Sequence, residues 1–150
     1  MNALNRKTTE PRGYAPINGL KMYCEIEGTG DPLVYIPPAF GFAGLKSFPA
    51  LVQSHSVITV DLQGNGRTAN IPERPISIEQ YAKDVVGLLK YLGISKADFF
   101  GESYGANAAA MIAVQSLHRS FARKRLTCTR LCVRAQDDSP AAMWSQRSVS

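Results

Sequence analysis

The chain has 150 residues, of which 45% are hydrophobic and 19% charged, a composition typical of a single globular domain with a core of its own. No apolar run approaches the roughly 20 residues of a membrane span, and the N-terminal stretch has no hydrophobic centre for a secretory signal, so we expect a cytoplasmic protein. Its three cysteines and two histidines are too few for a metal site, and we predict that the cysteines are free thiols and that no metal is bound.

The net charge of +5 comes entirely from the C-terminal part of the chain. Up to residue 115, ten basic and ten acidic side chains balance, whereas residues 116–150 hold seven basic and two acidic ones. The composition changes at the same point, to a segment rich in Arg, Ser and Cys. We therefore divide the chain into a flexible N-terminus (1–12), a patterned region (13–115) and a basic tail (116–150).

Three explanations of the basic tail stay open. It is an out-of-frame reading of the gene, which we favour, or it is disordered, which is compatible with the first explanation. The third explanation is a genuine appendage that binds nucleic acid or an acidic partner. Nucleic acid is the partner that we favour least.

The patterned region alternates between predicted strands and helices. Residues 19–32 (GLKMYCEIEGTGDP) alternate polar and apolar side chains and end in Gly and Pro, which predicts an antiparallel strand followed by a turn. The short apolar runs 33–38 (LVYIPP) and 57–62 (VITVDL) predict buried strands. Residues 77–94 have apolar side chains at helical spacing, with a capping residue at each end. This order predicts an α/β fold with a mostly parallel sheet and helices on both faces.

The stretch FFGESYGANA (99–108) places Gly101 two residues before Ser103 and Gly105 two residues after it. Small residues at both positions let a chain leave a strand, turn sharply and enter a helix, with the residue at the apex strained and pointing outward. The preceding ADFF predicts the strand, and the following alanine-rich segment predicts the helix. Ser103 is therefore a candidate nucleophile.

Taken in this order, the strands, IPPAFGF, DLQGNGRT, the amphipathic helix and GESYG resemble the N-terminal half of the α/β-hydrolase fold, in the esterase, lipase and epoxide-hydrolase-like group. The resemblance covers residues 13–115. It implies that Ser103 is the nucleophile and that the backbone N–H of Tyr104 is one donor of the oxyanion hole. The second donor would be the N–H of Ala39 or of Phe40.

The resemblance also assigns structural roles around this site. Pro37 and Pro38 have no N–H to donate, and the His-Gly that the family usually has in this loop is missing. In DLQGNGRT, the resemblance implies that Asp61, Gly64 and Gly66 shape the turn after the strand and that Arg67 helps to hold the turn in place. Glu102 is expected to line the pocket or to be exposed at its edge, and Asp84 is expected to be a solvated or capping charge.

A serine nucleophile needs a base, which is usually a histidine oriented by a carboxylate. In the family these groups follow the nucleophile, well beyond residues 104–150 of this chain. We expect His55 at the surface, and His118 to be more than about 20 Å from Ser103 at the far end of a helix. Asp137 and Asp138 receive no role, so we find neither a catalytic acid nor a catalytic histidine.

The function that the resemblance implies is hydrolysis of an ester or related acyl bond in a small-molecule substrate, through an acyl-Ser103 intermediate and without a cofactor. We expect negligible turnover by this chain alone. The alternative is a non-catalytic binding protein whose basic tail contacts nucleic acid or an acidic partner. If the sheet ended at the strand before Ser103, Phe99 and Phe100 would lie on an unpaired edge, which predicts self-association unless the tail or another copy covers it.

Overall fold

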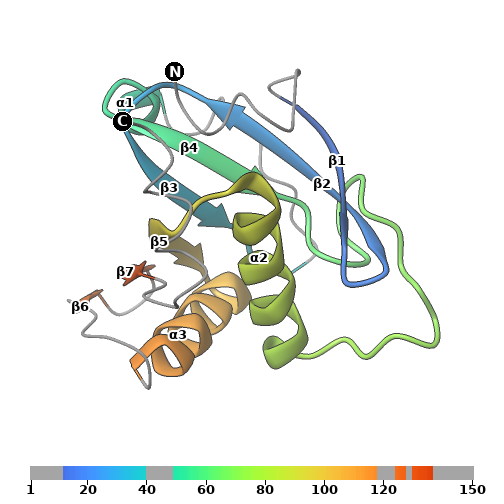
Figure 1. Cartoon of the computed structure of the whole chain (residues 1–150). Coiled ribbons are helices and arrows are strands. Elements are labelled where there is room, and N and C mark those ends of the chain that lie inside the picture. Colours follow the sequence, from blue (N-terminus) through green and yellow to red (C-terminus); the bar gives the residue numbers. More distant parts are fainter. Residues whose placement is uncertain (1–11, 40–48, 118–123, 128–129, 137–150) are drawn as a thin grey trace, which may run out of the picture.

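A computed structural model of the chain describes residues 12–39, 49–117, 124–127 and 130–136. Their strands and helices alternate through most of this region (Figure 1). The elements are, in chain order, β1 (Arg12–Ile17), β2 (Leu20–Glu27), β3 (Asp31–Ile36), α1 (Pro49–Val52), β4 (His55–Val60), α2 (Ile78–Leu92), β5 (Lys96–Glu102), α3 (Tyr104–Leu117), β6 (Lys124–Thr127) and β7 (Arg130–Gln136).

The described strands form one mixed sheet in the order β1-β2-β4-β3-β5-β7-β6. The three central strands β4, β3 and β5 are parallel, because a helical segment connects each of them to the next in the chain. On the outer side of β4, β2 and β1 are antiparallel and are joined by a tight turn with positive φ at Asn18 and Gly19, as a two-residue hairpin requires. The predicted α/β class is confirmed, with the parallel arrangement confined to the centre of the sheet.

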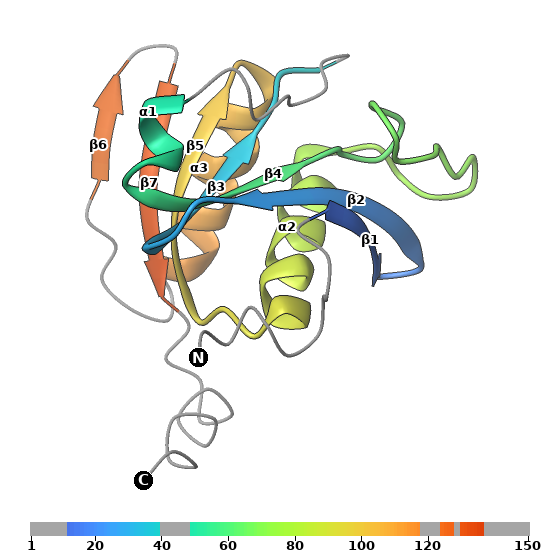
Figure 2. The ribbon, with the colours of Figure 1, turned by 90° about the horizontal axis from the view of Figure 1, so that it is seen from above.

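Helices α2 and α3 pack side by side on one face of the sheet, and the short α1 lies on the other face (Figures 1 and 2). Helix α2 has the caps that its sequence predicts: the Ser77 hydroxyl accepts from the Gln80 N–H, and Gly93 ends the helix with a φ of 73°. Its apolar side faces the sheet, with these residues buried: Tyr81, Ala82, Val85, Leu88, Leu89 and Leu92. No described helix is long and apolar enough to cross a membrane.

The main core lies between the sheet and these two helices. Alternate residues of the central strands point into it, among them Val34, Ile36, Ile58, Val60 and Phe99. From α3, Ala108, Ala109 and Ile112 complete the same cluster. The small alanine side chains allow α3 to approach the sheet closely.

Within the basic tail, residues 124–127 and 130–136 form strands β6 and β7. Strand β7 pairs antiparallel with β5 along the whole strand, from Lys96 opposite Gln136 to Glu102 opposite Arg130. The backbone of β5 that we expected to be unpaired is therefore covered, and β6 pairs outside β7. The free N–H and C=O groups of an edge strand favour such pairing. Residues 1–11 and, within the tail, residues 118–123, 128–129 and 137–150 lie outside the described residues.

Candidate active site

Ser103 is the single residue between β5 and α3, and its φ is +52°. A positive φ is uncommon in a residue with a side chain and stores local strain. The helix begins at once, because the Ser103 carbonyl accepts hydrogen bonds from the N–H groups of Ala106 (3.0 Å) and Asn107 (3.3 Å). The Ser103 side chain is exposed. The chain thus turns from strand to helix at one residue, whose hydroxyl is accessible.

The glycines on either side of Ser103 allow backbone to touch backbone. A Cβ atom on Gly101 would collide with the carbonyl group of Gly105. A Cβ atom on Gly105 would collide with the carbonyl oxygens of Ile36 and Pro37, at the end of β3. The first turn of α3 therefore packs directly against the ends of both β5 and β3.

This packing brings together the two segments expected to form the oxyanion hole. Strands β3 and β5 are in parallel register up to Ile36 opposite Gly101. The segments that follow them therefore leave the sheet at the same end of the strands. Tyr104 is the first residue of α3, where backbone N–H groups have no partner within the helix. On the β3 side Pro37 is buried and Ala39 is exposed. Phe40, the other proposed donor, lies outside the described residues.

The turn after β4 is held by Asp61, a buried carboxylate. Asp61 accepts hydrogen bonds from the backbone N–H of Arg67 (2.9 Å) and from its Nε (2.8 Å). Gly64 and Gly66 both have positive φ, and a Cβ atom on Gly66 would collide with the Asp61 carboxylate. Asp61 is therefore engaged in the turn itself.

Arg67 extends this contact to the outer strand β2. Its guanidinium lies 2.6 Å from the Glu25 carboxylate and over the ring of Tyr23, 3.8 Å from the ring centre. The hydrogen bond that Arg67 donates to the Asp61 carboxylate is the main reason why the pKa of Arg67 is raised further above its ordinary value. Arg67 thus anchors the turn through its backbone N–H, which binds Asp61, and through its guanidinium, which binds Asp61 and Glu25.

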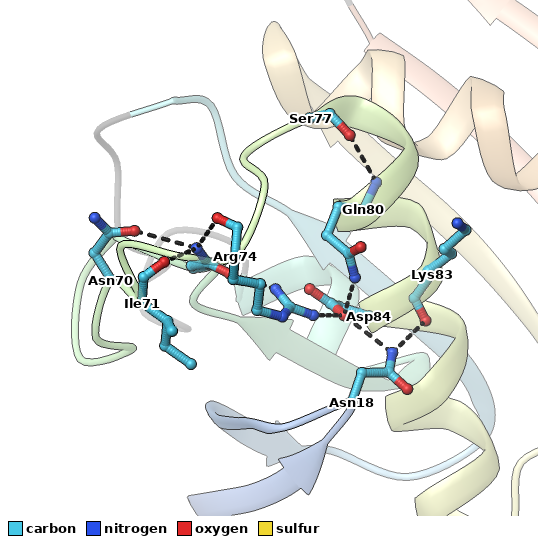
Figure 3. A network of polar contacts seen from close by, with 9 residues as sticks. Asn18, Asn70, Ile71, Arg74, Ser77, Gln80, Lys83 and Asp84 are labelled. Atoms are coloured by element: carbon cyan, nitrogen blue, oxygen red, sulfur yellow. Dashed lines mark hydrogen bonds and ion pairs between the residues drawn. The ribbon is translucent and has the colours of Figure 1, made fainter.

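A second polar network fixes the rest of the segment between β4 and α2 (Figure 3). Gln63 is buried, and its Nε2 donates to Asn70 Oδ1 (3.1 Å) and to the carbonyls of Ile71 (3.3 Å) and Arg74 (3.2 Å). Its Oε1 accepts from the Arg74 guanidinium. The side-chain amide of Gln63 therefore holds the loop through hydrogen bonds to Asn70, Ile71 and Arg74.

Arg74 also pairs with Asp84 on α2, which corrects the expectation that Asp84 is a solvated or capping charge. Asp84 is 1% exposed, and its Oδ1 also accepts from Asn18 Nδ2 and Gln80 Nε2, each at 3.0 Å (Figure 3). A sequence signal for this burial existed, because Asp84 lies three residues after Tyr81 and four before Leu88, on the apolar side of the helix.

The same loop is connected to the turn at Ser103 through Tyr81. Its hydroxyl donates to the Gln63 carbonyl (3.0 Å), and its ring meets the ring of Tyr104 edge-on, with centres 5.7 Å apart. Burial is the main cause that raises the pKa of Tyr81, so the hydroxyl keeps its proton as a donor. Sequence patterning identified Tyr81 only as a residue on the buried side of the helix.

Glu102, the residue before Ser103, lies on the opposite face of the sheet from α2 and α3. Phe99 is in the core, so the alternation of the strand turns Phe100 and Glu102 away from it. The Tyr35 hydroxyl donates to Glu102 Oε2 at 2.9 Å, and the Tyr35 ring stacks on that of Phe100, with centres 5.6 Å apart. Glu102 thus has a hydrogen-bonding partner on the neighbouring strand.

Of the two histidines, only His55 lies among the described residues, and it is not beside Ser103. His55 begins β4 opposite Asp31, the first residue of β3, so it lies at the other end of the parallel strands from Ser103. Its Nδ1 is 2.8 Å from the hydroxyl of Ser54. His118, Asp137 and Asp138 lie outside the described residues. Among the described residues, no histidine lies at the strand ends beside Ser103.

Cys24 is not a competing nucleophile. It is a free, buried thiol on β2, and burial raises its pKa to about 11. Since the thiolate is the reactive form, such a thiol is almost entirely unreactive at neutral pH. Ser103 remains the candidate nucleophile of the described residues.

The order β1-β2-β4-β3-β5, with a strained serine between β5 and α3, is that of the N-terminal part of the α/β-hydrolase fold, and the chain is similar to several hydrolases. The soluble epoxide hydrolase of Corynebacterium sp. (strain C12) is 32% identical over 97 residues, which are 63% of this chain and 34% of that protein. The zearalenone hydrolase of Bionectria ochroleuca is 30% identical over 103 residues, which are 63% of this chain and 38% of that protein.

The likeness extends to solved structures. The enol-lactonase from Burkholderia xenovorans LB400 superposes with a TM-score of 0.61 and 29% identity, over 71% of this chain and 43% of that chain. No family model matches the chain. These relatives are hydrolases, and this chain spans little more than a third of the length of the two curated ones.

Proposed function

We propose that Ser103 is the nucleophile of a serine hydrolase that acts on an ester or related acyl bond of a small molecule. The observation that carries the proposal is the positive φ of Ser103 at the turn from β5 into α3. Such a turn presents the hydroxyl beside the unpaired N–H groups of a helix N-terminus, as acyl transfer requires. The hydrolase relatives support the same reading, although their named substrates are their own.

In the proposed reaction, Ser103 Oγ forms a bond to the acyl carbon, and a base takes its proton. The N–H groups of Tyr104 and of Ala39 or Phe40 stabilise the oxyanion, and removal of one such donor typically costs on the order of 10²- to 10³-fold in rate. The alcohol leaves with a proton, and water then hydrolyses the acyl-Ser103 ester. A serine favours this acyl chemistry because it forms an ester intermediate that water can cleave.

The base and its carboxylate are not found among the described residues. The family order, with the nucleophile first and then the acid and the histidine, puts both after α3. We therefore expect the chain alone to bind and react slowly at Ser103, with negligible turnover. No cofactor enters any step.

The test is covalent labelling of the full chain with a fluorophosphonate, followed by mass spectrometry of the peptides. We expect slow labelling at Ser103 that is lost in Ser103→Ala, with no ester turnover above that variant. Labelling spread evenly over exposed serines would contradict a nucleophile at residue 103. Labelling and turnover as fast as those of an intact serine hydrolase would instead contradict the expected inactivity.

A second candidate function is binding through the basic tail, favoured by the seven basic and two acidic residues of 116–150. Phosphate contacts by such side chains weaken steeply as salt concentration rises. Retention on a nucleic-acid column that falls with salt and disappears in a chain ending at residue 117 would support this function. Equal retention of both chains would exclude the tail as the binding segment.

A further inference from the structure

Tyr35 and Glu102 form a hydrogen bond between the two strands that carry the candidate site. Tyr35 is the penultimate residue of β3, and Glu102 is the last residue of β5. The register pairs Tyr35 with Phe100, so Glu102 is its diagonal neighbour on the same face of the sheet. The Tyr35 side chain is buried, with 5% of the residue exposed, and its hydroxyl is 2.9 Å from Glu102 Oε2.

Each of these residues precedes one half of the proposed oxyanion hole by a few positions in the chain. Ser103 and Tyr104 follow Glu102, and the loop to Ala39 follows Tyr35 and Ile36. On the α3 face, the close packing of Gly105 joins the same two strand ends. The tyrosine–glutamate hydrogen bond joins them on the opposite face.

We propose that Tyr35 is a positioning residue for Ser103, an inference that rests on the proposed function. Its hydroxyl holds the Glu102 carboxylate against β3. This contact sets the position of the nucleophile turn relative to the loop after β3, and it keeps the carboxylate directed away from Ser103.

Both effects matter for acyl transfer. Oxyanion donors on two separate segments stabilise the transition state only when their relative position is maintained. A carboxylate free to move beside Ser103 would repel the negative charge that develops there. A hydrogen bond to an ionised carboxylate is strong enough to restrain both the side chain and the strand ends.

The first experiment compares Tyr35→Phe with Tyr23→Phe in the full chain. Tyr23→Phe is a matched control, because it removes a hydrogen bond of the same kind, from Tyr23 to Glu25 Oε1 at 3.0 Å, on β2. Fluorophosphonate labelling of Ser103 is measured over a range of probe concentrations. We expect Tyr35→Phe to lower the limiting rate about tenfold with an unchanged half-saturating concentration. The control keeps the rate of the parent chain.

The second experiment does not need a catalytic base. In a Ser103→Cys background, alkylation of residue 103 by iodoacetamide is followed against pH by peptide mass spectrometry, which separates it from the other cysteines. Release of the Glu102 carboxylate should raise the pKa of this thiol, so that Tyr35→Phe slows alkylation about threefold below that pKa. Glu102→Gln should remove this effect of Tyr35→Phe.

The other ionisable groups on these two strands and the helix are Asp31, Lys96, Asp98 and Tyr104, and the register of β7 places Arg130 opposite Glu102 and Arg134 opposite Asp98; none of these variants changes them. If Tyr35→Phe matches the Tyr23→Phe control in both experiments, the positioning role is wrong. If Ser103 of the parent chain is not labelled above the Ser103→Ala background, the proposed nucleophile fails, and the thiol experiment alone decides the role of Tyr35. If Tyr35→Phe fails to fold, Glu102→Gln alone is measured in the Ser103→Cys background. It should lower the pKa of the thiol at position 103.

Discussion

At Ser103 a strained backbone is held by contacts that leave no room for side chains. The φ of +52° costs free energy, and it persists because Gly101 and Gly105 allow the first turn of α3 to press against the ends of β5 and β3. The two glycines therefore do more than permit the turn. They hold the exposed serine at the same end of the strands as the loop that begins at Pro37.

Gly105→Ala should destabilise the chain by about 1–3 kcal/mol, because the new methyl group must displace the backbone at Ile36 and Pro37. Urea unfolding followed by circular dichroism measures the loss. Gly13→Ala on β1 is the control, since nothing lies within 4 Å of a Cβ atom there. Equal stability of Gly105→Ala and the parent chain would show that the strand ends are not in tight contact.

Among the elements, helix α2 supports the loop that connects β4 to it. Tyr81 and Asp84, one helical turn apart, hold the Gln63 carbonyl and the Arg74 guanidinium respectively. Asn18 Nδ2 in the β1–β2 turn donates to the same Asp84 carboxylate. Through the Tyr81–Tyr104 ring contact, this support reaches the turn at Ser103.

Arg74→Met should cost about 3–5 kcal/mol of unfolding free energy, because it leaves the buried Asp84 carboxylate without its countercharge. Arg74→Met combined with Asp84→Asn should lose less than the sum of the two single changes. Lys83→Met serves as the control, since Lys83 is the exposed neighbour of Asp84 on α2. Strict additivity of the two losses in urea unfolding would mean that the ion pair does not stabilise the fold.

Local patterns predicted the elements well because their causes are local. The caps of α2, Ser77 and Gly93, follow from residues within one turn of the helix end. The partners of Asp84 are far away in sequence, at Asn18 and Arg74, so its burial could not be derived from the charge alone. Likewise the glycines flanking Ser103 predict a sharp turn, whereas the approach of Gly105 to Pro37 depends on the register of two strands.

At the scale of the whole molecule, β7 and β6 extend the sheet beyond β5. The composition of their segment did not predict strands. Strand β7 pairs with β5 over the full length of both strands, and β5 is the strand that leads to Ser103. Without β7, the backbone groups along that side of β5 would be an edge open to other chains. The stability of the candidate site is thereby linked to residues 130–136.

A chain ending at residue 117 should therefore self-associate, because it keeps β5 and removes the strand that covers it. We expect oligomers that grow with protein concentration in size-exclusion chromatography with light scattering, since an uncovered strand edge pairs with other copies. A chain ending at residue 136 is the matched control: it keeps β6 and β7 and should remain monomeric at the same concentrations. If the chain of 117 residues is as monodisperse as the control, the pairing of β7 with β5 does not protect the sheet, and the basic tail has no structural part in the site.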